Sequence, residues 1–543
     1  MCLNQITTDR SNNKLFWHLF IVIVVFTRNQ VKSSSNTNEY FTSVTGLETL
    51  MKTEQTLLID LKQYVIETRQ QINLLEKEIS KISKEHDLAS ENLENYLANP
   101  VNAYKLIKRL MIDWEVYEEH IAKVIDFLKL IDERRNNLSF PELEDFHESA
   151  LALIRLQKTY QLTVPDVAAG KLNGIKYGYD MTWTDCLVLG QQLFHMKAYN
   201  QTKIWLQESV KRLQQDNDRF QLFPAGFLQE STENLIRLGD MDTALHLYNV
   251  METNHKEENK IKEMMQSTEI LEEPDNDDEN ILQIPYHKSA EFELYEKVCR
   301  GEVTQTPKEQ RDLRCYYVYE NCPFCRLAPF KVEDLNLDPE VKVFHNILSE
   351  KAIETIKALA SPHLIRSTVF GSDGVGAEKH NYRISKNAWL PYDSHSYLIG
   401  MLRDIHDITG LDMTYSEQLQ VANYGLGGHY EPHFDFFKHQ LPEEVGNRIS
   451  TAIFYLSDIE QGGATAFPFL KIAVKPLKGS VLFWYNLHRS LHGDYRTKHG
   501  ACPVLKGSKW IANVWTHERR QEFIRPCALH QDHEISLPYH TIK

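Results

Sequence analysis

Apolar residues near the start of the chain recur at alternating steps of three and four. Between Leu58 and Ile82 the run also contains Leu61, Val65, Ile72, Leu75 and Ile79, with Glu and Lys at many other positions. This spacing predicts a coiled-coil seam or a long amphipathic helix. An intramolecular helical hairpin has nearly the same pattern, but the length of the run favours dimerisation. A second helical segment is expected from Val101 to about Leu130.

The pattern changes to short paired helices between Trp183 and Met251. Leu189 and Trp205 lie where a first pair of helices would pack, and the run that begins at Leu238 indicates a turn followed by another helix. Such pairs are typical of tetratricopeptide-like units, which stack to form a groove that binds peptides. A plain helical bundle is the alternative, because three units are usually needed for a free-standing array.

The last third of the chain is rich in short apolar and β-branched runs. It follows a segment, His255 to Glu279, that is dominated by Glu, Lys, Asp and Asn and is predicted to be a solvated linker. Beyond about Val341, Gly, Pro and Asn clusters separate runs that predict strands. These runs are Leu419–Tyr424, Ile449–Leu456, Ser480–Tyr485 and Trp510–Trp515. Several short strands with turn signals predict a sandwich or jelly roll, so the fold class is α+β multidomain.

Charge and targeting signals narrow the class of protein. The net charge of −15 argues against a nucleic-acid binder. The apolar run 15–26, preceded by Arg10 and Lys14, is too short to span a bilayer comfortably and predicts a signal peptide, with an uncleaved anchor as the alternative. No other run has the length and hydropathy of a membrane helix, so no stable span is expected after signal removal. Asn137 and Asn200 begin glycosylation sequons, which only the secretory pathway uses.

Cysteine usage agrees with an oxidising compartment. The chain has 8 cysteines, and Cys2 lies before the predicted signal run. Cys299 and Cys315 are close in sequence, as are Cys502 and Cys527, and each pair can close a modest loop. Sequence alone does not determine the connectivity.

Cys322 and Cys325 stand apart, because they form a Cys-Pro-Phe-Cys motif. One interpretation is a redox or metal-binding pair. The preferred interpretation is a local disulfide, or alternative partners for the nearby cysteines. No second motif of this kind is present to complete a zinc site.

The strongest chemical signal is the run Tyr430-Glu-Pro-His-Phe-Asp. Residues two apart on a strand face the same side, so His433 and Asp435 can point at one metal ion while Phe434 packs behind them. His499, expected at the edge of another strand, is the candidate third ligand. Two histidines and one carboxylate form the facial triad of non-haem Fe(II) oxygenases, which leaves positions open for co-substrate and O2. Zinc is the alternative metal for such a set.

Lys509 favours the iron chemistry. It follows His499 by ten residues and precedes the apolar run Trp510–Trp515, which makes an inward position plausible. A lysine in the pocket can pair with the distal carboxylate of a dicarboxylic keto acid whose other end chelates iron. An isolated lysine is more often solvated, so this interpretation depends on the pocket.

Several runs in the last 200 residues of the chain resemble the catalytic domain of animal collagen prolyl 4-hydroxylase alpha subunits. They are Leu419-Gln-Val-Ala-Asn-Tyr-Gly-Leu-Gly-Gly-His-Tyr-Glu-Pro-His-Phe-Asp, Gly462-Gly-Ala-Thr-Ala-Phe-Pro, Phe483-Trp-Tyr-Asn, Gly493-Asp-Tyr, His499-Gly-Ala-Cys-Pro-Val-Leu and Trp515-Thr-His-Glu-Arg. More thinly, the run from Pro100 to Arg109 resembles the family's dimerisation region, and the run from Gly178 to Cys186 resembles the entry to its peptide-binding domain.

The resemblance implies a set of roles for the catalytic residues. His433, Asp435 and His499 match the iron ligands, and Lys509 matches the residue that anchors 2-oxoglutarate. The family's disulfides correspond to Cys299–Cys315 and Cys502–Cys527, so the Cys-Pro-Phe-Cys motif is an addition to the family pattern.

The resemblance extends to residues around the co-substrate and the peptide. Tyr424 and Thr465 match positions near the co-substrate, and His517 matches a histidine associated with its other carboxylate and with decarboxylation. The positions that line the peptide proline are matched by Tyr430, Arg448 and Trp515.

One departure concerns the expected peptide groove. The family carries tyrosines three residues apart before the Gly-Asp turn, which make a stacking surface for polyproline II peptides. Here the corresponding positions hold Glu230, Glu233 and Ile236. Recognition of long proline-rich chains is therefore in question, and a substrate with nearby basic residues is an alternative.

The resemblance also implies partners and a compartment. It adds Fe(2+), 2-oxoglutarate and L-ascorbate, a proline-containing secreted substrate, and protein disulfide isomerase as beta subunit of an α2β2 tetramer. The end of the chain is no KDEL-type signal, which fits retention in the endoplasmic reticulum lumen through a partner. The alternatives are a lysine or free amino acid substrate, a zinc hydrolase, and a catalytically weak peptide-binding or assembly subunit.

These observations divide the chain into seven segments. They are a signal peptide (1–35), a helical coiled-coil dimerisation domain (36–165), a tetratricopeptide-like peptide-binding domain (175–254), an acidic linker (255–283), a cysteine-containing connector (284–340), a jelly-roll dioxygenase domain (341–530) and a C-terminal tail (531–543).

Overall fold

The structure is a computed structural model that describes residues 66, 69–70, 72–121, 143–215, 225–252, 285–367, 369–370, 377–378, 382–425, 427–438 and 444–528. The predicted signal peptide, acidic linker and C-terminal tail lie outside the described residues, as do Asn137 and the seam up to Val65. The coiled coil stays a prediction. Within the described ranges, no helix has both the length and the apolar character needed to cross a bilayer.

Short helices follow the predicted seam and confirm the second helical segment as far as residue 121. They are α3 (Leu93–Leu97), α4 (Pro100–Lys108), a π-helical turn (Arg109–Asp113) and α5 (Trp114–Ile121). The Asn99 side chain caps α4 by accepting a bond from the Val101 backbone N–H, and Pro100 suits the first turn because it has no N–H to lose. Helix α7 (Leu143–Tyr160) packs against α4 through a shared apolar core.

A buried ion cluster ties α4 to the next helical layer. Lys108 is 2% exposed, and its Nζ lies 2.8 Å from Oδ1 of Asp113 and 3.1 Å from Oδ1 of Asp185. Burial opposes the charge on Lys108, but the two carboxylates outweigh burial and raise the pKa of this lysine. For Asp185, burial acts to raise the pKa, and the nearby lysines overcome it and lower the pKa.

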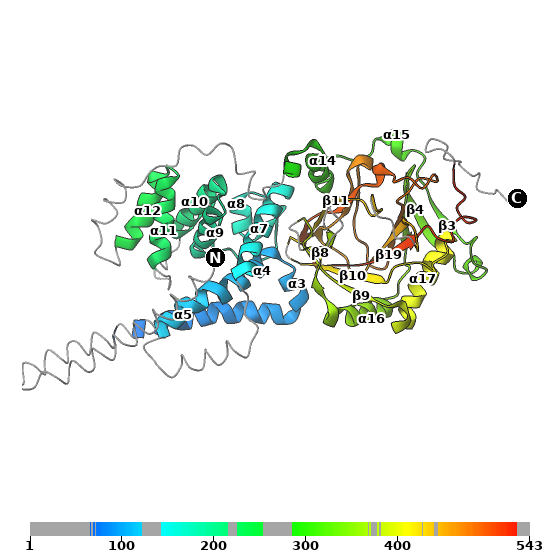
Figure 1. The fold of residues 1–543 in the computed structure, drawn as a ribbon. Coiled ribbons are helices and arrows are strands. Elements are labelled where there is room, and N and C mark those ends of the chain that lie inside the picture. The colour runs from blue at the N-terminus through cyan, green and yellow to red at the C-terminus, as the bar shows by residue number, and fades with distance from the viewer. Residues whose placement is uncertain are drawn as a thin grey trace, which may run out of the picture. The chain divides into compact units, whose positions relative to one another are not determined.

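Two antiparallel helix pairs follow: α9 (Trp183–His195) with α10 (Tyr199–Gln215), and α11 (Ala225–Arg237) with α12 (Met241–Glu252) (Figure 1). The first pair packs closely at Gly190, where an added Cβ would lie 2.7 Å from a methyl carbon of Leu206. The paired helices agree with the expected arrangement, and their membership of the tetratricopeptide class stays a prediction.

For one residue, the prediction of the peptide groove is wrong. Ile236 is 1% exposed and belongs to the core between the two helix pairs, so it cannot replace a groove tyrosine. Glu230 and Glu233 are partly exposed on α11, and Glu230 lies 3.0 Å from His195. The spacing did not predict this burial, because residues three apart on a helix are not exactly one turn apart. A series of such steps therefore shifts around the helix and reaches its buried side.

The largest sheet has nine antiparallel strands and begins upstream of residue 341, where the oxygenase domain was expected to start. In spatial order the strands are β3 (Cys315–Val318), β4 (Phe330–Leu337), β5 (Glu340–His345), β16 (Val481–Tyr485), β12 (Arg448–Tyr455), β19 (Lys509–His517), β10 (Leu419–Tyr424), β9 (Lys386–Leu390) and β6 (Ile365–Arg366). The four strands predicted from apolar runs are confirmed as β10, β12, β16 and β19.

A smaller antiparallel sheet packs against the large one across an apolar core. Its strands are β11 (Tyr430–His433), β17 (His499–Ala501), β14 (Thr465–Phe467) and β15 (Ile472–Val474). The shorter elements of the described chain are α8 (Val164–Ala168), β1 (Lys171–Leu172), β2 (Ile175–Lys176), α14 (Ala290–Cys299), α15 (Pro307–Gln310), β7 (Val369–Phe370), β8 (Ala377–Glu378), β13 (Gln461–Gly462) and β18 (Val504–Lys506). This pair of antiparallel sheets fits the expected sandwich.

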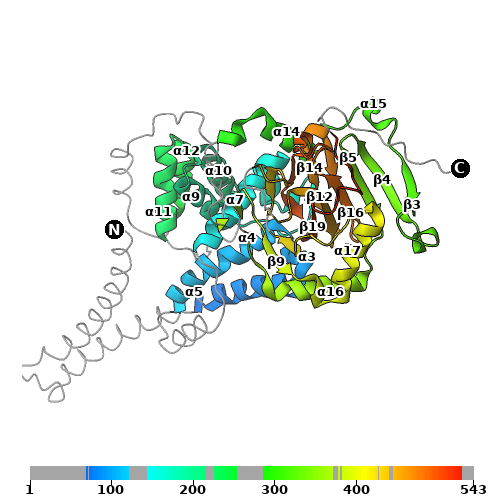
Figure 2. The same cartoon turned by 45° about the vertical axis from the view of Figure 1, so that its right-hand side comes forward.

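Side-chain alternation gives the large sheet two different faces. On β19, Ala512 and Val514 pack toward α16 (Glu350–Ala360) and α17 (Ser396–Thr409), which cover one face (Figure 2). The intervening side chains of β19 face the small sheet and line a cavity: Lys509, Ile511, Asn513 and Trp515. The large sheet thus places four alternate residues of β19, from Lys509 to Trp515, at the candidate site.

The disulfides expected from the resemblance are wrong. Cys299, the last residue of α14, bonds Cys502, which follows β17, across a sequence separation of 203. Helix α14 packs on β14 and brings Cys299 to Cys502, whereas Cys315 on β3 and Cys527 after β19 are exposed and free. Closeness along the chain was a poor guide because sheet packing, not chain distance, sets which cysteines meet.

The Cys-Pro-Phe-Cys motif closes on itself. Cys322 and Cys325 form a disulfide with their Cα atoms 5.3 Å apart. The preferred interpretation of this motif, a local disulfide, is therefore confirmed.

Candidate active site

Strand register brings the three candidate metal ligands together. His433 and His499 are directly paired across β11 and β17, and a register shift separates this pair from Tyr430 and Ala501. Asp435 lies two residues beyond the end of β11, in a bend and not in the strand as expected. The ligand atoms of His433, Asp435 and His499 all lie within 4.8 Å of one another, so the predicted convergence is present.

Hydrogen bonds to the backbone orient both imidazoles. His433 Nδ1 lies 2.8 Å from the Glu431 carbonyl oxygen, and His499 Nδ1 lies 3.1 Å from the Thr497 carbonyl oxygen. Each Nδ1 donates a proton to its carbonyl, which leaves the lone pair of Nε2 free for a metal ion. Each Nε2 lies 3.6 Å from a carboxylate oxygen of Asp435.

The site favours neutral imidazoles and an ionised carboxylate. Burial and the neighbouring His499 lower the pKa of His433 to about 3, and burial also lowers the pKa of His499. Burial acts to raise the pKa of Asp435, but the two histidines and then Arg448 outweigh it and lower the pKa to about 2. These are the protonation states that metal binding requires.

Two donors fix the Asp435 carboxylate. Its Oδ2 accepts a bond of 2.8 Å from Thr451 Oγ1 and one of 3.1 Å from Trp515 Nε1. Both donors come from the large sheet, Thr451 from β12 and Trp515 from β19. The carboxylate is therefore oriented before any metal binds, since hydrogen bonds to the ligands of a metal site fix the positions of those ligands.

A cavity of about 400 Å³ joins the triad to Lys509. Lys509 begins β19 and is 1% exposed, so the inward position expected from the sequence is confirmed. Its Nζ lies 5.3 Å from the centre of the Tyr424 ring, and no carboxylate of the described chain pairs with it. Burial lowers the pKa of Lys509 to about 7. A buried cation without a carboxylate partner is suited to an anionic ligand.

The residues predicted to lie near the co-substrate line the same cavity. Tyr424 ends β10, and Thr465 begins β14 and bonds Tyr455 through its hydroxyl at 2.8 Å. Burial raises the pKa of Tyr424, so its phenol stays a neutral hydrogen-bond donor. The co-substrate roles of Tyr424 and Thr465 stay predictions.

Aromatic and cationic side chains continue the cavity beyond the triad. Tyr430 stacks on His433 with ring centres 3.6 Å apart, and the Arg448 guanidinium lies 4.1 Å from the Trp515 ring centre. All three residues predicted to contact the peptide proline, Tyr430, Arg448 and Trp515, line the cavity. Their contact with substrate stays a prediction.

His517 lies elsewhere. It ends β19 and is 3% exposed, but it is not among the residues that line the cavity. Its Nδ1 faces the Gly446 carbonyl oxygen at 2.8 Å, and its Nε2 lies 3.0 Å from Glu417 Oε1. His517 therefore lies outside the cavity that the triad and Lys509 line, and its predicted contact with the co-substrate and its catalytic role stay predictions.

Sequence reasoning missed three residues that shape the site. Glu417 accepts two bonds from Arg448, at 2.5 and 2.8 Å, and so links Arg448 to His517. The Arg383 guanidinium lies 4.8 Å from the Tyr430 ring centre and lines the cavity. Only Thr451 had a usable signal, because it is a polar residue on the inward-facing positions of an otherwise apolar strand.

The donor set fits ferrous iron and a keto acid. Two imidazole nitrogens and one carboxylate on one side leave coordination positions open, which is the arrangement of non-haem Fe(II) oxygenases. Lys509, lining the same cavity, fits the distal carboxylate of 2-oxoglutarate. Bound iron and 2-oxoglutarate supply the oxidising chemistry, while the chain orients the ligands and surrounds the reacting centre with buried aromatic rings.

Comparisons with known proteins agree with this geometry. Residues 43–174 match the family described as prolyl 4-hydroxylase alpha-subunit, N-terminal region, and residues 419–517 match the 2OG-Fe(II) oxygenase superfamily. The chain is 35% identical over 538 residues to prolyl 4-hydroxylase subunit alpha-1 of Homo sapiens, covering 95% of this chain and 99% of that protein. It is 36% identical over 513 residues to subunit alpha-2 of Caenorhabditis elegans, covering 91% and 94%.

A solved structure of the viral collagen prolyl hydroxylase from Paramecium Bursaria Chlorella virus-1, in complex with 2OG, is 26% identical to this chain. The match covers 32% of this chain and 94% of that one, with a TM-score of 0.28. The near full-length relatives and the two matched domains show the family of this chain. The chain belongs to the family of prolyl 4-hydroxylase alpha subunits, and it is a catalytic proline 4-dioxygenase subunit that uses Fe(II) and 2-oxoglutarate.

Proposed function

We propose that the chain hydroxylates peptidyl proline in secreted proteins, collagen-like chains among them, in the endoplasmic reticulum lumen. The observation that carries this proposal is one cavity that is lined by the triad of His433, Asp435 and His499, by the Trp515 ring and by Lys509, which pairs with no carboxylate of the described residues. A proline ring is flat and apolar, so the indole of Trp515 and the phenol of Tyr430 offer suitable packing surfaces.

The compartment is supported by covalent chemistry. A disulfide between Cys299 and Cys502, buried in the core beneath α14, is typical of proteins that fold in an oxidising environment. The apolar run 15–26 supports entry into the secretory pathway. Exposed Asn200 begins a sequon that such a pathway can glycosylate.

The chain is proposed to work in an α2β2 tetramer with protein disulfide isomerase as beta subunit, and to use L-ascorbate to keep its iron ferrous. Dimerisation is supported by apolar residues of the predicted seam that stay exposed in the single chain, Ile72 at 49% and Ile79 at 63%. Four paired helices, α9 to α12, support a tetratricopeptide-like peptide-binding domain.

The groove chemistry suggests a substrate preference. Glu230 and Glu233 place acidic groups on α11 where the family has tyrosines. Carboxylates attract lysine and arginine better than they stack on proline rings, so prolines near basic residues are the proposed substrates. A neutral polyproline peptide is expected to bind this chain more weakly than a basic one.

The test uses the full chain co-expressed with protein disulfide isomerase and supplied with Fe(II), 2-oxoglutarate and ascorbate. Two peptide sets of equal length are compared, one of Pro-Pro-Gly repeats and one with lysines at intervals, and mass spectrometry locates added oxygen. Oxygen on proline, with lower KM for the basic set, is expected. Oxygen on lysine, or succinate release that no peptide stimulates, contradicts the proposal, and a Glu230→Gln/Glu233→Gln variant should remove the preference without lowering kcat.

A further inference from the structure

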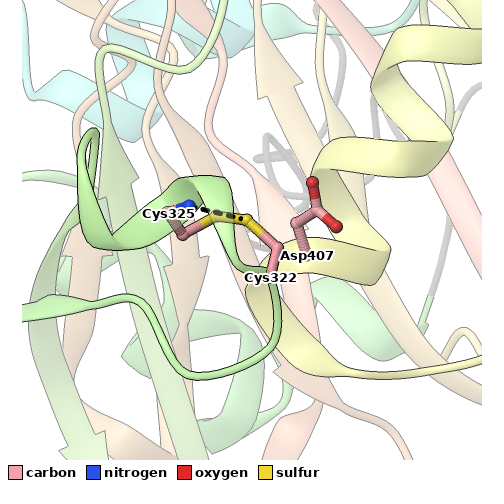
Figure 3. A group of neighbouring side chains, drawn as sticks. All are labelled: Cys322, Cys325 and Asp407. Carbon is pink, nitrogen blue, oxygen red and sulfur yellow. Dashed lines mark hydrogen bonds between the residues drawn. A yellow bond between two sulfur atoms is a disulfide. The ribbon is translucent and has the colours of Figure 1, made fainter.

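The Cys-Pro-Phe-Cys motif is left unused by the oxygenase chemistry. Its disulfide lies between β3 and β4, on a short 3-10 turn, Phe324–Arg326, that faces α17 (Figure 3). The Asn321 side chain donates a bond of 3.0 Å to the Ile408 carbonyl oxygen, which holds the motif against the end of α17. This anchor places the Asp407 carboxylate beside the sulfur atoms, and the ligand atoms of Cys322, Cys325 and Asp407 lie within 4.8 Å of one another.

The two sulfur atoms have different surroundings. Cys325 is 3% exposed, whereas Cys322 is partly exposed and accepts a 3.0 Å hydrogen bond at its Sγ from the Cys325 backbone N–H. A thiol can therefore reach Cys322 more easily than Cys325. A backbone N–H that points at sulfur also stabilises a thiolate at that position, which makes Cys322 the better nucleophile once the bond is open.

We propose that Cys322–Cys325 is an exchangeable redox pair that accepts two electrons from thiols, with Asp407 as the group that carries the proton. The thiols belong to glutathione or to a cysteine pair of another protein. Two apolar side chains next to the pair are exposed, Phe324 at 70% and Leu327 at 83%. An apolar peptide can pack on them, whereas glutathione has no apolar side chain to do so. This proposal is independent of the substrate proposed above.

The exchange balances as two successive displacements. A thiol gives its proton to Asp407 and attacks Cys322 Sγ; a bond forms between the two sulfurs, and the Cys322–Cys325 bond breaks with its electron pair on Cys325, which takes the proton from Asp407. A second thiol attacks the sulfur of the first, so that the two thiols leave as a disulfide and Cys322 leaves as a thiolate, which takes the second proton. Two thiols are oxidised and one disulfide is reduced.

The first experiment uses the second disulfide as an internal reference. The full chain, with its free thiols blocked, is equilibrated in glutathione buffers from oxidised to reduced, quenched with a mass-tagged alkylating agent and analysed by peptide mass spectrometry. Cys322 and Cys325 are expected to be labelled at a reduced-to-oxidised ratio at least about tenfold lower than Cys299 and Cys502. Opening of both disulfides at the same ratio, or only with loss of the circular dichroism of the fold, overturns the proposal.

Single variants test the assigned roles. In Cys325→Ser, oxidised glutathione should form a mixed disulfide on Cys322, whereas Cys325 in Cys322→Ser should react at least about tenfold more slowly because it is buried. Equal rates contradict the assignment. Asp407→Asn should slow reduction by dithiothreitol about tenfold or more, while the matched change Asp393→Asn, at an exposed carboxylate near the start of α17, should not.

The source of the thiols is separated by a third comparison. Reduction by glutathione is measured beside reduction by a leucine-flanked Cys-x-x-Cys peptide at equal thiol concentration, in the unaltered chain and in Phe324→Ser/Leu327→Ser. A faster peptide reaction that this variant slows assigns a protein thiol, and equal reactions assign glutathione. Failure of both reagents to reduce the pair in the folded chain overturns the proposal.

Discussion

The two most deeply buried lysines among the described residues lie one in the helical region and one in the oxygenase domain, and their surroundings are opposite. Lys108 is 2% exposed and sits between the carboxylates of Asp113 and Asp185. Lys509 is 1% exposed, its Nζ lies 5.3 Å from the Tyr424 ring centre, and no carboxylate of the described residues pairs with it. The carboxylates raise the pKa of Lys108, whereas burial alone lowers the pKa of Lys509 to about 7.

The difference in partners distinguishes a structural lysine from a ligand-binding one. A buried charge with partners inside the chain holds elements together, and removing it leaves the partners uncompensated. A buried charge without partners costs stability in the empty protein, and a ligand recovers that cost when it binds. Exposure alone does not distinguish the two lysines, so the partner set is the informative observation.

The largest effect is expected from Lys108→Met. Two buried carboxylates would lose their cation, and the free energy of unfolding should fall by about 3–5 kcal/mol. Urea denaturation followed by circular dichroism measures the change. Adding Asp185→Asn to Lys108→Met should recover part of the loss, and a single variant as stable as the unaltered protein would show that the cluster is not structural.

The next effect is expected from Lys509→Met. Loss of a charge-assisted bond of about 1.5–3 kcal/mol should raise the KM for 2-oxoglutarate roughly 10- to 150-fold. Its thermal midpoint should not fall, because an unpaired charge has left the core. Steady-state kinetics and a melting curve on the same sample check the KM and the thermal midpoint. A variant with a lower thermal midpoint and an unchanged KM would show that Lys509 has a structural role, as Lys108 does.

A smaller effect is expected at the Asp435 carboxylate, the negatively charged group of the same cavity. Trp515→Phe removes the indole N–H that bonds Asp435 Oδ2 while keeping an aromatic ring, and the Fe(II) affinity should fall about 10- to 100-fold. Anaerobic iron titration gives the dissociation constant. Trp389→Phe is the matched control, because Trp389 lines the same cavity and packs on Trp515 but does not donate a hydrogen bond to Asp435.

The smallest effect is a pH dependence at Lys509. Binding an anion favours the ammonium, so affinity for 2-oxoglutarate should be constant below about pH 7 and should fall up to tenfold per pH unit above it. Without ligand, the unfolded chain binds a proton at this lysine between about pH 7 and about pH 10.4 and the folded chain does not, so stability rises with pH in that window. Calorimetric titration and pH-dependent denaturation measure both, and Lys509→Arg should show neither slope.

Local patterns predicted much of the catalytic half. Apolar and β-branched runs located β10, β12, β16 and β19, and the position of Lys509 just before such a run supported the inward position that the structure confirms. The helices α16 and α17 were not predicted, although they cover a whole face of the large sheet. Their apolar stripes lie in a stretch that the sequence predicted to be rich in strands.

Residues that act through distant partners were beyond sequence reasoning. Glu417 meets Arg448 and His517 only because β12 and β19 lie side by side, and nothing in the spacing of these residues announces it. The pairing of Cys299 with Cys502 was missed for the same reason, since it depends on how α14 packs on the small sheet. Periodicity reports the faces of an element, and packing decides which faces meet.

The link between Cys299 and Cys502 has a consequence for synthesis on the ribosome. The two cysteines are 203 residues apart, so at ordinary translation rates the first waits roughly 10–40 s for the second. Cys315, Cys322 and Cys325 emerge during that interval and offer nearer but incorrect partners. We therefore expect a newly made chain to need a catalyst of disulfide exchange, which corrects premature disulfides until the last strands have been synthesised.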